Sequence, residues 1–174
     1  MNIAVVAEPK IELVTRTSFR LHLRPVAPED KAQLADFFSR LTPEDLRFRF
    51  LSAAQEVSSD TLSTLMSVDH QDSEDFLAFD DEGELVASAV VAGDRVMERA
   101  EVAISVRSDL KGRGIGWTLL EYLGRIAAER GFQTIESIES RDNRAVIELE
   151  AEMGFRAQPY EGDPRLVLVS KTLR

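Results

Sequence analysis

The sequence predicts an α/β fold built around one strand, a glycine-rich turn and one helix. Residues 99–107 alternate apolar with polar or small side chains, which is the pattern of a half-buried strand. Residues 111–116, KGRGIG, follow this strand closely and contain three glycines. From residue 115 onward, apolar side chains recur at three- and four-residue spacing, as in an amphipathic helix. Because the first N–H groups of a helix have no internal partners, this turn is predicted to bind an anion such as phosphate.

The part of the domain before this unit is predicted to begin with one strand and then to be helical. Residues 21–25 are expected to form the first strand. Pro28 then stands at a first helical position, and an apolar stripe follows as far as Leu41. Thr42 is placed to cap a second helix, and residues 60–67 are expected to form a short third one.

Strands dominate the middle of the chain, and helices alternate with strands at its end. Residues 80–83, DDEG, are a hairpin signal between two apolar runs. The remaining predicted elements are strands at 75–79, 84–91, 133–139 and 166–172, and a helix that begins after Asn143 and ends before Gly154. This order of elements is that of a mixed α/β domain.

Composition excludes several kinds of site. A chain of 174 residues is long enough for one domain with a substantial core. It has no cysteine, so disulfides, thiolate metal sites and a cysteine nucleophile are excluded. His22 and His70 lack the company of other metal ligands, so no metal is expected.

Charge and hydropathy bear on partners and location. The net charge of −10 argues against general nucleic-acid binding, which needs clustered cations, and is compatible with a cationic substrate such as an amine. The first residues lack the basic flank and apolar run of a signal peptide. No apolar stretch approaches the length of a membrane span. We therefore expect a cytoplasmic protein without nucleic-acid or membrane partners.

The spacing of the glycines disfavours two nucleotide sites. The dinucleotide fingerprint Gly-x-Gly-x-x-Gly is not matched, because glycines 112, 114 and 116 are all two residues apart. The four-residue gap and the Gly-Lys-Ser/Thr ending of a P-loop are not matched either. A nicotinamide or ATP site is thus disfavoured, and a ligand-free turn in a plain structural domain stays as an alternative.

Two motifs resemble the GNAT superfamily of N-acetyltransferases. Lys111 to Gly116 is similar to its Gln/Arg-x-x-Gly-x-Gly/Ala, with a lysine that keeps the charge of arginine but not its shape. Asn143 and the helix ending at Gly154-Phe155 resemble its second motif. The stretches LRPVAPED, LTPEDLRFRF and AEVAISVRSDLKGRGIG resemble the acetyltransferase domain of bacterial protein lysine acetyltransferases. The resemblance covers roughly residues 19–173.

The resemblance implies the GNAT fold. This is a mixed, mostly antiparallel sheet of six to seven strands, flanked by about four helices, in which the central strand splays from its neighbour to leave a V-shaped cleft. Residues 19–174 are expected to form this domain. Residues 1–18 would be an N-terminal extension, with Ile3 to Val6 as a short strand or a tail, that covers the cleft, makes a dimer or stays loose.

The resemblance also implies acetyl-CoA as cosubstrate. Backbone N–H groups of residues 113–117 would hold its pyrophosphate, and the strand edge at residues 104–106 would pair with the pantetheine amides. Lys111 and Arg113 would add charge, the Thr118 hydroxyl would donate to phosphate, and Asn143 would face the thioester. The full set of expected coenzyme contacts is Ile104, Ser105, Val106, Lys111, Gly112, Arg113, Gly114, Ile115, Gly116, Trp117, Thr118 and Asn143.

Glu101 is the candidate for the general base. An amine with a pKa near about 10.4 must lose a proton before or during its attack on a thioester. Glu101 lies on the central strand, on the face opposite Val102 and Ile104, and matches a glutamate of the resembling protein acetyltransferases. Glu98 is the second candidate.

The general acid is left open by the sequence. Many superfamily members carry a tyrosine seven residues after the asparagine that corresponds to Asn143, and here that position is Glu150. Tyr160 would substitute if its loop folds back, whereas Tyr122 is expected to be packed.

The expected activity is transfer of an acetyl group from acetyl-CoA to a primary amine, with a protein lysine as the first expectation. A small-molecule amine is the rival acceptor. A coenzyme-binding regulatory module without turnover is the second rival, favoured by Glu150 in the tyrosine position.

Overall fold

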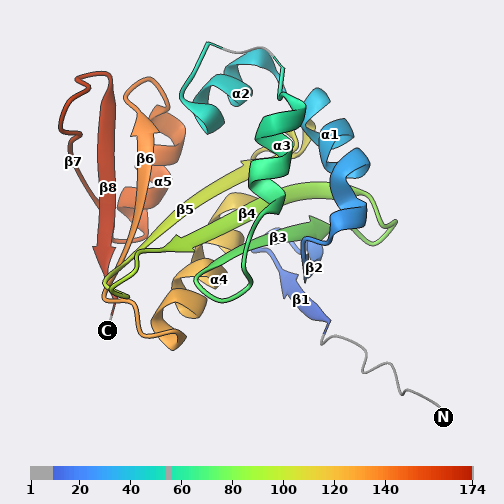
Figure 1. Ribbon diagram of the computed structural model, residues 1–174, viewed down its shortest axis with the longest axis horizontal. Helices are drawn as coiled ribbons and strands as arrows, with labels where there is room; N and C mark the ends of the chain where they lie inside the picture. The colour runs from blue at the N-terminus through green and yellow to red at the C-terminus, as the bar shows by residue number, and fades with distance from the viewer. Residues whose placement is uncertain (1–9, 54–55, 174) are drawn as a thin grey trace.

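The computed structural model describes residues 10–53 and 56–173, which form an eight-stranded sheet with helices on both faces (Figure 1). The strands are β1 (Ile11–Val14), β2 (Arg20–Pro25), β3 (Ser73–Phe79), β4 (Leu85–Gly93), β5 (Arg99–Val106), β6 (Thr134–Ser140), β7 (Arg156–Pro159) and β8 (Leu166–Thr172). Their order across the sheet is β1-β2-β3-β4-β5-β6-β8-β7. The helices are α1 (Lys31–Ser39), α2 (Pro43–Phe50), α3 (Ser59–Met66), α4 (Ile115–Glu129) and α5 (Arg144–Glu152), with 3₁₀ turns at Pro28–Asp30 and Ser108–Leu110.

The sheet opens between β5 and β6. These two strands run parallel and pair only through residues 99–101 and 134–136. β4 continues to pair with β5 as far as Val106, and β8 with β6 as far as Ser140. Figure 1 shows the two strands diverging from their paired ends. The splayed arrangement that the resemblance implied is therefore present, and β5 has an inner edge with no strand partner in the described sheet beyond Glu101.

Each face of the sheet has its own hydrophobic core. On one face, α1, α2 and α3 cover a cluster that includes Leu34, Phe37 and Phe38. On the other face, α4 and α5 cover a larger cluster, in which Leu119 and Leu123 are fully buried. The alternation along β5 separates the two faces, because its even-numbered residues pack toward α4 and its odd-numbered residues point the other way.

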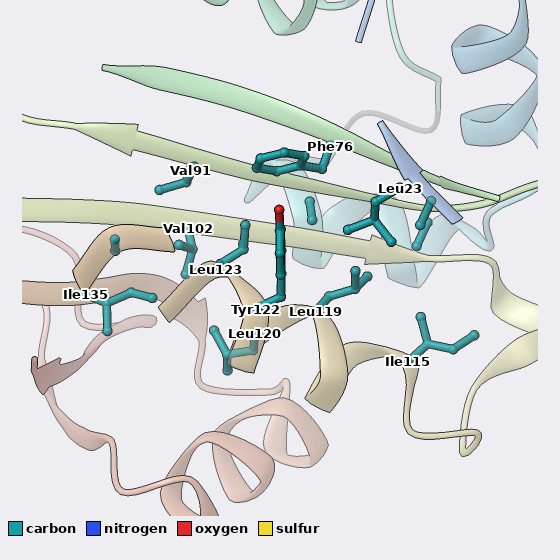
Figure 2. Close-up of a cluster of buried hydrophobic side chains, with 14 of the residues drawn as sticks. Leu23, Phe76, Val91, Val102, Ile115, Leu119, Leu120, Tyr122, Leu123 and Ile135 are labelled. Atoms are coloured by element: carbon teal, nitrogen blue, oxygen red, sulfur yellow. The ribbon is translucent and has the colours of Figure 1, made fainter. Parts of the chain in front are cut away.

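The long helix α4 is fixed by its apolar stripe. Figure 2 shows Leu119, Tyr122 and Leu123 between the helix and the strands above it. The Tyr122 ring meets Phe76 edge-on, with ring centroids 5.4 Å apart. Tyr122 is therefore a packing residue, as predicted. Ile115 is also buried at the first turn, which holds the start of the helix in place.

Two edge strands account for the difference between the expected six to seven strands and the observed eight. β1 pairs antiparallel with β2, and β7 with β8. The segment RAQP of β7 is exposed throughout and shows no apolar alternation, so the sequence gives no strand signal there. β1 lies within the segment 1–18 that we expected to be an extension. The predicted strand or tail at Ile3 to Val6 lies outside the described residues.

The second helix lies over the open part of the sheet, and capping residues define its two ends. The Thr42 hydroxyl accepts a hydrogen bond from the Asp45 N–H at 3.2 Å, so the predicted N-cap is confirmed. Leu51 ends the helix in the left-handed conformation with φ +51°. Leu46 is buried in the core under α1 and α3, which directs Arg49 toward the gap between β5 and β6.

Candidate active site

A cavity of about 340 Å³ occupies the opening between β5 and β6. Its walls come from five elements: α2, β5, the start of α4, β6 and α5. Of the residues expected to contact the coenzyme, those that line it are Ile104, Ser105, Val106, Lys111, Gly112, Gly114, Ile115, Gly116, Trp117 and Asn143. Arg113 and Thr118 belong to the same turn and helix start but lie outside this lining.

The glycine-rich turn presents bare backbone donors to the cavity. Gly112 and Gly114 both have φ +79°, a conformation that residues with a Cβ rarely adopt. In residues 10–53 and 56–173, the backbone N–H groups of residues 112–117 find no acceptor, and no side chain caps the helix. The turn therefore has the geometry of an anion site at the positive end of a 15-residue helix.

The polar side chains around the turn are largely engaged by the protein itself. The Lys111 ammonium pairs with the Asp45 carboxylate, which also accepts a hydrogen bond of 2.6 Å from Ser108. The Thr118 hydroxyl donates to the Gly114 carbonyl at 2.9 Å, so its proton is already in use. The Arg113 guanidinium lies 6.0 Å from the centre of the Phe19 ring. Lys111 and Thr118 are thus already paired within the protein, whereas the main-chain N–H groups of the turn are free.

The turn between β1 and β2 supports the glycine-rich turn from outside. The Thr17 hydroxyl donates a 2.7 Å hydrogen bond to the Arg113 carbonyl. The Arg16 guanidinium lies 3.9 Å from the centre of the Trp117 ring, which lines the cavity. Residues 15–17, part of the segment expected to be an extension, thus contact the predicted coenzyme turn.

The β5 wall offers both backbone and hydroxyl groups. Ile104 packs against the α4 core, whereas Ser105 points the other way and is 5% exposed. Its Oγ has no hydrogen-bond partner among the described residues. A buried hydroxyl without a partner is uncommon, and it favours a polar ligand at this wall.

The opposite wall carries carboxyl groups that the sequence interpretation did not single out as a set. Asn143 heads α5 without a side-chain cap, and its Nδ2 donates to Glu139 Oε2 at 3.4 Å. Ser137 Oγ donates to Glu150 Oε1 at 2.6 Å. Glu150 is 2% exposed, and its Oε2 has no partner among the described residues. All four residues line the cavity.

Burial raises the pKa of both carboxyls. The pKa of Glu150 is raised to about 7 by loss of hydration, against the hydrogen bond from Ser137. The pKa of Glu139 is raised to about 8, first by burial and then by the charge of Glu150. At neutral pH this pair therefore holds a proton that two exposed carboxyls would have lost.

Arg49 projects into the cavity from the third side. It makes no hydrogen bond or ion pair within the described parts of the chain. Burial lowers its pKa, while the charges of Asp75, Glu101 and Glu139 raise it. Its LRFRF context gives no signal of a cleft position, because that position depends on how α2 packs over the sheet.

Glu101 lies at the paired end of the cleft. It stands opposite Ala92 on β4 and Glu136 on β6, with its side chain exposed and outside the cavity lining. Partial loss of hydration raises its pKa, Glu136 raises it further, and Arg49 lowers it. Glu98, the second candidate, precedes β5 and is also exposed. Glu101 thus remains a prediction for the base.

A further buried carboxyl, Asp75, lies on β3 and outside the cavity lining. Asp75 is fully buried on β3, accepts a 2.9 Å hydrogen bond from Ser88 and leaves Oδ2 without a partner in the described residues. Burial raises its pKa to about 6, and Arg49 opposes this shift. Its signal in the sequence is an aspartate at the start of a predicted apolar strand.

The site fits an extended ligand with phosphate at one end. Bare amides and two glycines with positive φ form a cradle at the helix start, and the unpaired edge of β5 leads away from it. The fold and this cleft together define a protein with an open seam between two strands of its sheet and free main-chain donors at one end of that seam.

Comparison with known proteins identifies the family. The model of the Acetyltransferase (GNAT) family matches residues 35–155. An acetyltransferase of Pseudomonas aeruginosa is 32% identical over 149 residues, which cover 84% of this chain and 80% of that protein. The chain therefore belongs to the GNAT family of acetyltransferases, and membership implies acyltransferase activity.

Solved structures agree on the fold. The GNAT domain of S. lividans PAT has a TM-score of 0.85 at 22% identity, covering 94% of this chain and 97% of that one. A spermidine N-acetyltransferase from Vibrio cholerae, in complex with CoA and spermine, has a TM-score of 0.71 at 16% identity, covering 88% and 95%. At these identities the likeness shows a shared fold rather than a shared acceptor.

Two features are absent from the residues that the structure describes. None of the helices there combines the length and apolar content that a bilayer crossing requires. No group of three or more histidine, aspartate or glutamate side chains in that part of the chain is arranged to hold a metal ion.

Proposed function

We propose that the protein transfers an acetyl group from acetyl-CoA to a primary amine, with the cosubstrate lying in the cleft between β5 and β6. The observation that carries this proposal is the continuity of the unpaired β5 edge with the bare amides of residues 112–117. Coenzyme A has an amide-bearing arm and a diphosphate, which need these two kinds of backbone partner in this order.

The proposed coenzyme contacts follow from which donors and charges are not already paired within the protein. The diphosphate would be held by amides of residues 113–117, and the pantetheine amides by β5 at residues 104–106. Lys111 is paired with Asp45, so its attraction for phosphate would be weakened by the neighbouring carboxylate. Thr118 would have to give up its bond to Gly114 before it donated to phosphate. Asn143 would face the thioester end.

The proposed acceptor is a cationic amine. Acidic side chains from β6 and α5 line the cleft, and Asp75 and Glu101 lie near its α2 side, while Arg49 and Lys111 are the cations among the lining residues. A protein lysine is our first proposal, because the stretches LRPVAPED, LTPEDLRFRF and AEVAISVRSDLKGRGIG resemble bacterial protein lysine acetyltransferases. A small-molecule amine such as a polyamine is the second.

In the proposed reaction the amine loses one proton and then attacks the thioester carbonyl carbon. Glu101 would accept that proton, directly or through water, because a nucleophilic amine must be neutral. The C–N bond forms, the C–S bond breaks, and the second proton of the nitrogen leaves as the amide forms.

A panel of acceptors tests this function. Free coenzyme A is measured after the protein is incubated with acetyl-CoA and a lysine peptide, spermidine, an amino acid or no acceptor. We expect thiol release only with an amine present, and product mass 42 Da above the acceptor is the check on transfer. Tight binding of acetyl-CoA without transfer to any amine would instead support a regulatory module.

A further inference from the structure

We propose that the carboxyl group of Glu150 protonates the departing coenzyme thiolate, and that Glu139 supplies the proton back to Glu150. This inference rests on the proposed function and adds a second proton-transfer group to it. It arises from the wall formed by β6 and α5, where two carboxyls, one serine and one asparagine face the same cavity.

The position of Glu150 argues against a purely structural carboxylate. One oxygen accepts a hydrogen bond from Ser137, but Oε2 is buried at the cavity wall with no partner among the described residues. An ionised carboxylate would be costly there, since several kcal/mol are lost when a charge is buried without compensation, so the neutral acid is favoured. A neutral acid with a free oxygen is a proton donor.

The neighbouring groups support the same protonation state. Glu139 is the carboxyl that faces Glu150 from β6, and mutual repulsion keeps the pair from ionising together. Asn143 donates to Glu139 on the far side of the pair. Arg49 reaches toward Glu139 from α2 and favours its ionised form, but the pKa of Glu139 is still raised to about 8, above the value of about 7 for Glu150. When only one proton is bound it is therefore expected to rest on Glu139, and Glu150 is the acid while both carboxyls are protonated.

The tyrosines are poor rivals for this role. Tyr122 is buried in the core under β3 and contacts Phe76 (Figure 2). Tyr160 is 36% exposed in the loop after β7 and does not contribute to the cavity wall. Among the described side chains that line the cavity, the protonated carboxyls are thus the acids available.

The proton balance closes within the cleft. The first proton of the ammonium leaves to Glu101. Attack gives a tetrahedral adduct that still carries a proton on nitrogen. As the C–S bond breaks, Glu150 gives its proton to sulfur and takes one from Glu139, and the nitrogen proton passes to Glu139. The products are the acetylated amine, the free thiol and one proton released to solvent.

The test is the pH profile of kcat at saturating acetyl-CoA and amine. In the unmodified protein kcat should fall on the alkaline side as Glu150 loses its proton. Glu150→Gln keeps an acceptor for the Ser137 hydroxyl but has no acidic proton, so kcat should drop about 100-fold and the alkaline fall should vanish. Glu148→Gln, an exposed change on the same helix, is the matched control and should behave like the unmodified protein.

A second variant separates catalysis from structure. Ser137→Ala removes the hydrogen bond that lowers the pKa of Glu150, so the alkaline fall should move to higher pH. A structural role for Glu150 would not move that limb in this direction. An unshifted limb in Ser137→Ala, or a normal kcat and alkaline fall in Glu150→Gln, would overturn the proposal.

Calorimetry with coenzyme A keeps the two proposals apart. We expect Glu150→Gln to bind coenzyme A as the unmodified protein does, because no coenzyme-anchoring amide is changed. If the unmodified protein does not bind coenzyme A, the proposed function fails. If binding is normal and the pH profile of Glu150→Gln is also normal, only the role of Glu150 fails.

Discussion

At the scale of single residues, the ionisable groups in and beside the cleft shift one another's pKa values. Arg49 is the cation that faces Asp75, Glu101 and Glu139. It opposes the upward pKa shift of each, so it keeps the proposed base available at a lower pH than burial alone would permit. Its guanidinium lies 4.9 Å from the centre of the Phe50 ring, and it makes no hydrogen bond or ion pair among the described residues, so it acts on these carboxyls through its charge.

The Glu101 assignment leads to the first prediction. Glu101→Gln should lower kcat/KM by about 100-fold and remove the acidic limb of its pH profile, since the amine then lacks a proton acceptor. Steady-state kinetics from acid to neutral pH measures both effects. Glu98→Gln, which changes the other candidate just before β5, is the control and should retain the limb.

Two neighbours of Glu101 should move that limb in opposite directions. Arg49→Gln removes the charge that lowers the pKa of Glu101, so the acidic limb should shift to higher pH. Glu136→Gln removes the charge that raises this pKa, so the limb should shift to lower pH. Shifts of the same sign in both variants would show that another group is the base.

At the scale of elements, the anion site depends on backbone shape rather than on side chains. The sequence predicted the strand, the turn and the helix because alternation, glycines and a 3.6-residue repeat are local signals. It also predicted the Thr42 cap. It did not predict that Lys111 is bound to Asp45, since that pair joins residues 66 positions apart.

A substitution at Gly114 tests whether the anion site depends on backbone shape. Gly114→Ala places a side chain at φ +79°, which should distort the turn and weaken coenzyme A binding at least tenfold. Titration calorimetry gives the dissociation constant. Gly131→Ala, at the other end of α4 with φ +92° and open space around it, carries the same backbone strain away from the site and should leave binding unchanged.

An equal loss of affinity in both glycine variants would contradict this account, because it would trace the effect to the general stability of α4. Circular dichroism of each variant establishes that the helix is still formed, and the comparison then rests on binding alone.

At the scale of the whole molecule, the cleft follows from the way the sheet is assembled. β5 and β6 pair only at their first residues, and their diverging parts are flanked by α2 on one side and α5 on the other. The edge strands β1 and β7 escaped prediction because four-residue segments leave little pattern. The cluster of Glu139, Glu150 and Arg49 escaped it because these residues meet only after β6, α5 and α2 are packed.

The buried carboxyls make a prediction about global stability. Their pKa values are raised in the folded state, to about 6 for Asp75, 7 for Glu150 and 8 for Glu139. The stability they contribute is fully present below their unfolded pKa of about 4 and is lost as pH rises through these values. The free energy of unfolding should therefore fall between pH 5 and pH 8.

Urea unfolding at pH 5 and at pH 8 measures this fall in the free energy of unfolding. In Glu150→Gln the fall should be smaller by about 2–3 kcal/mol, because one titrating group is removed. The exposed Glu148→Gln change should leave it unaltered. A free energy of unfolding that rises over this interval would mean that the carboxyls are ionised in the folded protein.

A crystal structure with coenzyme A bound tests the central claim most directly. The account predicts diphosphate oxygens within hydrogen-bonding distance of the main-chain amides of residues 113–117, and the pantetheine arm paired with β5 at residues 104–106. Coenzyme A bound outside the β5–β6 cleft, or those amides turned toward protein acceptors in the complex, would contradict it.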